Sequence, residues 1–191
     1  MYMKSVVPGL LVFFLVFISC AAEKPRITAP VKSNTVKPID KNPAIVVDFQ
    51  KEFLKQINKV RTEGCKCGDT FMQPVEPLTW NTQLHISALA HAQDMARNKY
   101  FSHVSKNGDK IKDRITAAGY TYTGYQSFTI GENIAFNQRS IKEVMEGWLN
   151  SPSHCKNIMS PAFKEVGIGM QDYYWVQDFG GKVAFPKNPK R

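Results

Sequence analysis

The sequence predicts an α+β domain in which several helices pack on a largely antiparallel sheet. Four stretches between residues 48 and 150 carry apolar residues at the three- and four-residue spacing of one helix face. After them, the stretches 165–171 and 173–180 are apolar and aromatic with the alternation of strands. Helices combined with a hairpin of this kind are typical of a layered α+β fold.

The first two helices are predicted from long apolar stripes. One covers residues 48–64, with Asp48 as its N-cap and Gly64 as its stop. Its apolar face contains Phe49, Phe53, Ile57 and Val60. The other covers residues 80–100 and has small side chains in its stripe, which permit close packing. This second stripe contains Leu84, Ala88, Ala92 and Met95.

Two shorter helices follow. The helix at residues 109–119 begins with Asp109 as its N-cap and ends at a glycine. The helix at residues 140–150 opens with Ser140, and Glu143 stands three residues later. This spacing is that of a capping box, in which the two side chains bond free backbone N–H groups at the helix start.

The strands are predicted in the last third of the domain and before the fourth helix. Gln171 and Asp172 separate the two alternating stretches and form the expected hairpin turn. Aromatic segments at residues 120–125 and 130–136 supply the remaining strand candidates.

The basic charge of the chain lies mostly outside the predicted domain. The formal net charge is +9, yet residues 48–181 contain 15 Lys or Arg against 14 Asp or Glu. The surplus therefore lies in the N-terminal segment and in the tail 182–191, which argues against a nucleic-acid groove on the domain. A basic tether suits an anionic membrane surface, or it serves only solubility.

The N-terminus predicts export from the cytoplasm. Residues 1–19 have the features of a signal peptide, since Lys4 precedes nine unbroken apolar residues, too few to span a bilayer. The following Ser19 and Cys20 resemble the lipobox of bacterial lipoproteins, although Phe17 replaces the usual leucine. This resemblance implies lipidation of Cys20; ordinary secretion and a short uncleaved anchor are the alternatives.

Between this leader and the domain, residues 20–47 read as a flexible, solvated tether. The chain is therefore divided into leader, tether, a domain at residues 48–181 and a short basic tail.

Two of the four histidines are candidates for a functional site. His103 and His154 lie in predicted loops bounded by turn residues, where functional side chains are often presented. His85 and His91 lie six residues apart in the second helix and point to different faces, so a packing or surface role is expected for them.

Glu132 stands between these histidines in the otherwise apolar segment GENIAF. A carboxylate there must reach solvent in a cleft or find a partner, and the two loop histidines are natural partners. His103, Glu132 and His154 would suit a divalent metal such as zinc with an open coordination position. No HExxH motif is present, and a metal-free hydrogen-bonded cluster is an equal alternative.

Nucleophilic catalysis finds little support in the sequence. Ser102 and Ser153 each precede a histidine directly, and adjacent side chains rarely form a nucleophile–base pair. A glycine-rich nucleophile elbow, a phosphate loop and a dinucleotide fingerprint are all missing from the sequence. These features favour a protein that is not an enzyme.

The cysteines predict one disulfide within the domain. If Cys20 is lipidated, three cysteines remain for the domain. Cys65 and Cys67 are too close in sequence to form a disulfide with each other comfortably. Cys155 is therefore expected to pair with one of them, closing a loop of about ninety residues that contributes up to ~4 to 5 kcal/mol. A zinc site made of these three cysteines and His154 is the alternative.

Several motifs together resemble one family. The segments PLTWN, HAQDMARNKYFSH, RITAAGY, GENIA, EGWLNSPSHCKNIM and EVGIGM occur in this order, within residues 49–179. They resemble the bacterial branch of the CAP superfamily, also called the SCP domain. The resemblance implies a three-layer α-β-α sandwich with a cleft lined by His103 of YFSH, His154 of SPSH and Glu132 of GEN.

One position departs from the pattern of many eukaryotic members of the family. They carry a second glutamate three residues after the helix tryptophan, whereas Trp148 is followed at this distance by Ser151. Ser151 is therefore expected to line the cleft in place of this acid. A full four-residue metal site is not expected, and His103, Glu132 and His154 remain as possible ligands.

The resemblance leaves several functions open, because one fold hosts many activities. Related proteins have been linked with sterol or lipid binding, with divalent-metal dependence and with proteolysis. The leading hypothesis is an extracytoplasmic, lipid-anchored binding module for an envelope component or a small apolar molecule. The alternatives are a metal-dependent hydrolase that uses the same cleft and a purely structural envelope protein.

Overall fold

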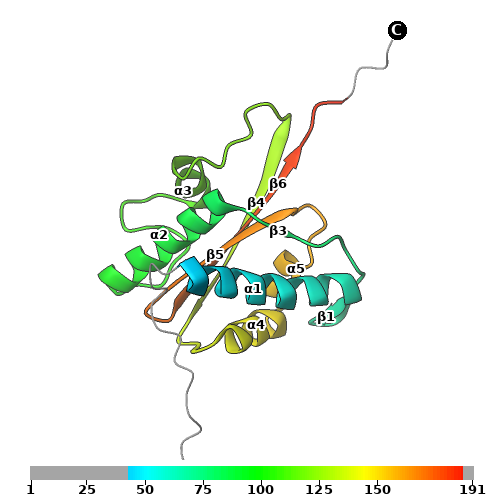
Figure 1. The fold of residues 1–191 in the computed structure, drawn as a ribbon, viewed down its shortest axis with the longest axis horizontal. Helices are drawn as coiled ribbons and strands as arrows, with labels where there is room; N and C mark the ends of the chain where they lie inside the picture. Colours follow the sequence, from blue (N-terminus) through cyan, green and yellow to red (C-terminus); the bar gives the residue numbers. More distant parts are fainter. Residues whose placement is uncertain (1–42, 187–191) are drawn as a thin grey trace, which may run out of the picture. The chain divides into compact units, whose positions relative to one another are not determined.

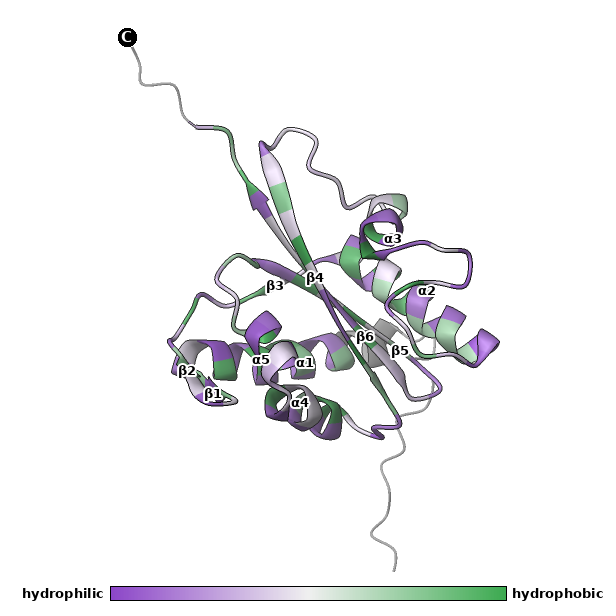
Figure 2. Cartoon of the chain, turned by 180° about the vertical axis from the view of Figure 1, so that it is seen from behind, coloured by the Kyte–Doolittle hydropathy of each residue, from purple (hydrophilic) through white to green (hydrophobic). Residues whose placement is uncertain are grey.

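Two layers of helices enclose a central sheet, as expected for a three-layer α-β-α sandwich. The structure is a computed structural model that describes residues 43–186, with side chains from Asp48 onward. Helices α2 and α3 lie on one face of the sheet, and α1, α4 and α5 lie on the other, as Figure 1 shows from the front and Figure 2 from behind. The described residues all belong to one compact unit.

Five helices and six strands build this unit. The helices are α1 (Pro43–Glu63), α2 (Thr82–Asn98), α3 (Ile111–Ala117), α4 (Ile141–Asn150) and α5 (Pro152–Ile158). The strands are β1 (Cys65–Cys67), β2 (Thr70–Met72), β3 (Thr79–Trp80), β4 (Ser127–Phe136), β5 (Glu165–Gln171) and β6 (Tyr174–Val183). None of the helices in this part of the chain is long and apolar enough to cross a bilayer.

The central sheet has the strand order β3-β5-β6-β4. Strand β6 pairs antiparallel with both β5 and β4, and the two-residue β3 pairs parallel with β5, so the sheet is largely antiparallel as predicted. In the β4–β6 register, Glu132 lies opposite Asp178. Strands β1 and β2 form a separate small hairpin directly after α1.

The first helix is longer than predicted. It begins at Pro43, so Asp48 lies inside the helix rather than at its N-cap. Proline is favoured at the first helical position because its fixed φ suits the helix and its missing N–H leaves no donor unpaired. The helix ends as predicted at Gly64, which has a φ of 76° and donates its N–H to the Val60 carbonyl. Residues 43–47 therefore belong to α1 and not to the predicted tether. The leader and the tether up to residue 42 lie outside the described residues.

The other helix starts differ from the predictions in detail. Asn81 caps α2 by accepting a hydrogen bond from the Leu84 N–H. Helix α3 is capped at Lys110 and not at Asp109. Ser140 caps α4 as predicted, by accepting from the Glu143 N–H. The return bond of the capping box is displaced by one residue, since the Glu143 carboxylate accepts from the N–H of residue 139.

Three further predictions about local structure change. Residues 120–125 contain no strand and instead turn at Gly124, where φ is 85°. The hairpin between β5 and β6 turns at Asp172 and Tyr173, both with positive φ, whereas Gln171 ends the strand. The segment that carries His154 is the short helix α5 and not a loop, with Pro152 in its first turn.

The core is divided by the sheet. The larger part contains the aromatic face of α1 together with Trp148, Trp175 and Phe179, on the side of α1, α4 and α5. On the other side, the predicted alanine stripe of α2 packs with Val176, the next residue along β6 after Trp175. This alternation along β6 is what a sheet with helices on both faces requires.

Arg61 ties the end of α1 to the end of α5 and the segment that follows it. Its side chain is fully buried, and its guanidinium donates to the carbonyls of Glu76, Ile158, Ser160 and Phe163. Burial lowers the pKa of Arg61 to about 10. The cation therefore remains charged at neutral pH and holds the C-terminal end of α5, through Ile158, against the first helix.

Helix α2 lies unusually close to strand β5. A Cβ atom on Gly167 would lie 2.0 Å from the backbone nitrogen of His85, and one on Gly169 would lie 2.3 Å from the Cα of Leu89. The glycines of the EVGIGM segment therefore allow the backbones of helix and strand to touch. This contact sets the depth at which α2 sits on the sheet.

We predict that Gly169→Ala destabilises the fold by about 3 kcal/mol or more, because the new methyl group meets helix backbone that cannot rotate away. Chemical denaturation of the variant measures the loss in free energy of unfolding. Gly147→Ala is the matched control, since a Cβ at this helical position has only the Gln138 Nε2 atom, at 3.9 Å, within van der Waals range. It should stabilise the protein by up to about 1 kcal/mol. Equal losses in both variants would contradict the close-contact account.

Candidate functional site

Two of the predicted cleft residues, His103 and Glu132, form a hydrogen-bonded cluster with Arg114. The Glu132 carboxylate, from β4, accepts from His103 Nδ1 at 2.7 Å and from Arg114 Nη2 at 2.5 Å, one bond to each oxygen. We call these residues the cleft cluster. The side chains of Glu132 and Arg114 are 3% and 7% exposed, whereas that of His103 is 56% exposed. A buried ion pair therefore supports an imidazole that faces solvent.

The cluster lowers the pKa of Glu132 and fixes the tautomer of His103. Burial alone raises the pKa of Glu132, but the hydrogen bond from His103 and the charge of Arg114 outweigh it and hold this pKa below its usual value. Because the carboxylate only accepts, His103 Nδ1 carries the proton of this bond, and Nε2 is left toward solvent.

A second carboxylate lies behind the first. Asp178, opposite Glu132 in the sheet, is fully buried and accepts a hydrogen bond from the Ser87 hydroxyl at 2.7 Å. Burial and the neighbouring charge of Glu132 raise the pKa of Asp178 well above its usual value, which favours its neutral form. Glu132 therefore carries the negative charge that balances Arg114.

His154 belongs to the helix layer on the other face of the sheet (Figure 1). It lies on α5, which β4 holds through Asn133, whose side chain donates to the His154 carbonyl at 3.2 Å and to Gln177 at 2.9 Å. Asn157 adds a bond to the Asn133 side-chain oxygen. Burial and the nearby charge of His103 lower the pKa of His154. Among the described residues, no hydrogen bond joins its ring to the cleft cluster.

Ser151, the fourth predicted cleft residue, serves as a junction. It ends α4 and precedes α5, and its hydroxyl lies 3.4 Å from that of Ser153. Its extended backbone allows the chain to turn from one helix into the next.

The predicted set of three metal ligands does not fit a metal in this arrangement. Both Glu132 oxygens are engaged, one of them by a guanidinium cation that opposes a second positive charge. The donor atoms of His103, Glu132 and His154 also do not all come within 4.8 Å of one another. In the described part of the chain, the three cysteines are the one group of His, Cys, Asp and Glu side chains that meets this distance.

A pocket of about 490 Å³ lies between α2, α3 and the loop before α3. We call it the α2–α3 pocket. Its apolar lining consists of Ile86, Ala90, Ala117 and Ala118. Its polar lining consists of Ser87, His91, Asp94, Ser105, Lys106, Asn107, Asp109 and Arg114. Arg114 belongs to both the pocket and the cleft cluster, so the two are directly connected.

The pocket wall contains a serine–histidine pair that sequence reasoning missed. Ser105 Oγ lies 3.2 Å from His91 Nδ1, and His91 Nε2 lies 2.9 Å from the Ser102 carbonyl. The carbonyl only accepts, so Nε2 carries the proton and Nδ1 accepts from the serine hydroxyl. Arg114 Nη1 donates to the same Oγ at 3.2 Å. Burial and the charge of Arg114 lower the pKa of His91, which favours the neutral, accepting imidazole.

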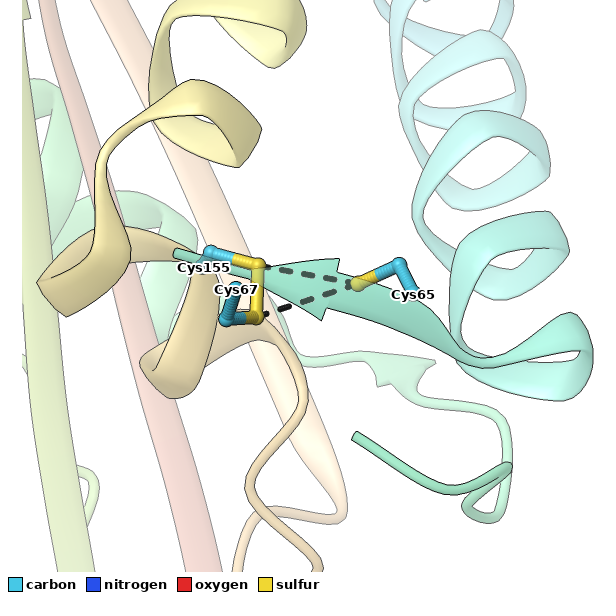
Figure 3. Close-up of side chains that lie close together, drawn as sticks. All are labelled: Cys65, Cys67 and Cys155. Carbon is cyan, nitrogen blue, oxygen red and sulfur yellow. Dashed lines mark hydrogen bonds between the residues drawn. A yellow bond between two sulfur atoms is a disulfide. The ribbon is translucent and has the colours of Figure 1, made fainter. Parts of the chain in front are cut away.

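The cysteine prediction is resolved in favour of one pairing. Cys67 and Cys155 form a disulfide with a Cα–Cα distance of 5.4 Å and a sequence separation of 88 (Figure 3). Cys65 is the free, partly buried cysteine of the described residues. The bond joins the β1 strand to α5, one residue after His154, and so helps to fix the helix that presents this histidine.

We predict that Glu132→Gln destabilises the domain by about 3 kcal/mol, because it leaves the buried Arg114 cation without its counterion. Chemical denaturation at neutral pH measures the change. The control is Glu146→Gln, which removes an exposed carboxylate that lies 3.8 Å from Lys142 and should change stability by less than about 0.5 kcal/mol. A loss in Glu132→Gln no larger than in the control would show that the ion pair does not hold the cluster.

Comparisons with known proteins agree with this architecture. The chain is 31% identical over 156 residues to the uncharacterized protein YkwD of Bacillus subtilis (strain 168), covering 81% of this chain and 55% of YkwD. It is 36% identical over 102 residues to the uncharacterized membrane protein YlbC of the same strain, covering 53% of this chain and 28% of YlbC. The chain thus spans about half or less of these relatives.

The structure resembles an extracellular protein containing an SCP domain from Bacillus anthracis str. Ames. The TM-score is 0.58 at 28% identity, over 75% of this chain and 45% of the other. Residues 54–179 match the cysteine-rich secretory protein family, CAP, which covers most of the described unit. The chain therefore belongs to the CAP family.

Proposed function

We propose that this CAP domain is an extracytoplasmic binding module for a small amphipathic molecule held in the α2–α3 pocket. The observation that carries the proposal is the pocket itself, whose volume of about 490 Å³ is within the usual range for small-molecule sites. Its wall of alanines and Ile86 suits an apolar body. Its polar side chains carry both signs of charge, which suits a polar or zwitterionic head group more than a bare ion.

The N-terminal sequence and the relatives support a location outside the cytoplasm. The leader has the length and charge of a signal peptide, and Cys20 follows it at a lipobox-like position. The Bacillus anthracis protein is extracellular and YlbC is a membrane protein. An anchor at Cys20 would keep the pocket near the envelope, where amphipathic molecules are abundant.

We predict that Ala90→Trp fills the pocket and weakens binding of a fluorescent fatty-acid analogue about tenfold or more, measured by fluorescence titration of the purified chain. Ala96→Trp is the matched control, since Ala96 lies on the same helix but does not line this pocket. It should bind like wild type. Wild-type binding no stronger than that of Ala90→Trp would refute the proposal for this probe class, and equal loss in both variants would place binding elsewhere.

A second function, ester hydrolysis, is favoured by the Ser105–His91 contact. In this reaction the Ser105 oxygen attacks the carbonyl carbon of an ester, and its proton passes to His91 Nδ1 and then to the departing alcohol. Water hydrolyses the resulting acyl-serine. Arg114, which donates to Ser105 Oγ, favours the developing negative charge on this oxygen. No metal takes part in these steps.

A fluorophosphonate probe tests this second function, because it reacts with activated serine hydroxyls. We expect mass spectrometry to find one adduct on Ser105 in wild type and none in Ser105→Ala. Ser102→Ala should keep the adduct, since Ser102 meets His91 only through its backbone carbonyl. If wild type forms no adduct, the hydrolase function is excluded, while ligand binding in the pocket is tested separately.

A further inference from the structure

Three sulfur atoms meet at the junction of β1 and α5 (Figure 3). Cys65 and Cys67 are two residues apart on a strand, so their side chains leave the same face. The Cys65 sulfur lies 3.6 Å from that of Cys155 and 3.8 Å from that of Cys67. Cys67 and Cys155 are buried, and Cys65 is partly buried. The third cysteine therefore stands beside the disulfide, almost equally far from both of its sulfurs.

These distances match the geometry of a metal thiolate site. Zinc binds thiolates in a tetrahedron with Zn–S bonds of about 2.3 Å, which places neighbouring sulfurs ~3.8 Å apart. Cys65 already holds this separation from both other sulfurs. A tetrahedral site needs this separation between all three pairs of sulfurs. Only the Cys67–Cys155 pair, which the disulfide holds closer together, has to move apart.

We infer that Cys65, Cys67 and Cys155 form a redox-controlled site for a soft divalent cation such as zinc. In the oxidised protein, Cys67 and Cys155 are a disulfide and the site is closed. A dithiol reductant supplies two electrons and two protons, its own thiols become a disulfide, and the Cys67–Cys155 bond becomes two thiols. Zinc then binds three thiolates with release of three protons, and water completes the tetrahedron.

The geometry favours a site of three cysteines over the four-ligand zinc site with His154 that the sequence left open. The sulfur atoms of all three cysteines lie within 4.8 Å of one another, but no His154 nitrogen joins the group. The backbone carbonyl of His154 accepts a hydrogen bond from Asn133 of β4. The cation site is therefore a three-cysteine site that leaves His154 to the cleft.

The site gives α5 a cross-link in both redox states. The disulfide ties Cys155 of α5 to the β1 strand, and a bound cation would tie the same helix to the same strand after reduction. Reduction without metal would remove this cross-link, whose contribution to stability is expected to be large for a loop of this length.

Metal titration of the full chain tests the inference. Every sample carries Cys20→Ser, so that the Cys20 thiol does not compete for the metal. The protein is reduced with a phosphine that binds metal weakly and titrated with Co²⁺ and Zn²⁺. We expect one equivalent of Co²⁺ to produce thiolate-to-cobalt absorption, and Zn²⁺ to displace it. The reduced Cys65→Ser variant should bind about tenfold or more weakly, and oxidised wild type should show no thiolate absorption.

Thermal unfolding provides a second readout that does not depend on the cobalt spectrum. Zn²⁺ should raise the melting temperature of reduced wild type clearly more than that of reduced Cys65→Ser, because the variant binds the cation more weakly. In the oxidised state the two proteins should melt alike, because Cys65 is outside the disulfide. If reduced wild type and reduced Cys65→Ser bind zinc equally, or if neither binds it, the three-cysteine site does not exist.

Discussion

The close contact between α2 and strand β5 is the constraint on which the rest of the site depends. Gly167 and Gly169 let helix backbone rest directly on strand backbone, where any Cβ would collide. At this depth the Ser87 hydroxyl reaches the buried Asp178. The same helix carries His91 to the pocket wall and leads into the loop of His103. If α2 lay farther from the sheet, Ser87 and His91 would lose their present positions. The two glycines of β5 therefore position side chains that lie far from them in the sequence.

Arg114 connects the cleft cluster with the α2–α3 pocket. Its guanidinium neutralises Glu132, donates to Ser105 and lines the α2–α3 pocket. One buried cation therefore influences three groups: it lowers the pKa of Glu132, lowers that of His91 and polarises the serine hydroxyl. The Arg114 cation thus balances the charge of Glu132 in the cleft cluster and also lines the pocket beside it.

Helix α5, seven residues long, is held by several independent contacts. Arg61 binds the carbonyl of its last residue, Asn133 binds its first turn, and the disulfide joins Cys155 to the β1 strand. A helix this short has little stability of its own. Its position, and with it that of His154, therefore comes from tertiary contacts that cover the whole element.

Periodicity and composition determined the elements that make regular local contacts. The apolar stripes of α1 and α2, the Ser140 cap, the Gly64 stop and the layered α+β class all follow from residues close in sequence. The motifs likewise indicated that His103 and Glu132 belong together, since a carboxylate in an apolar strand needs a partner. The same reasoning applied to Asp178 would have identified the second buried carboxylate.

Contacts between distant segments were decided only by the tertiary structure. The sequence restricted Cys155 to two partners, and the placement of β1 against α5 selected Cys67 while leaving Cys65 beside the bond. Arg114 looked like an ordinary helix residue because its partners lie 9 and 18 positions away. A sequence pattern records which face a side chain occupies, but hydrogen bonds and charge pairs depend on which faces meet, and that is determined by packing of the whole chain.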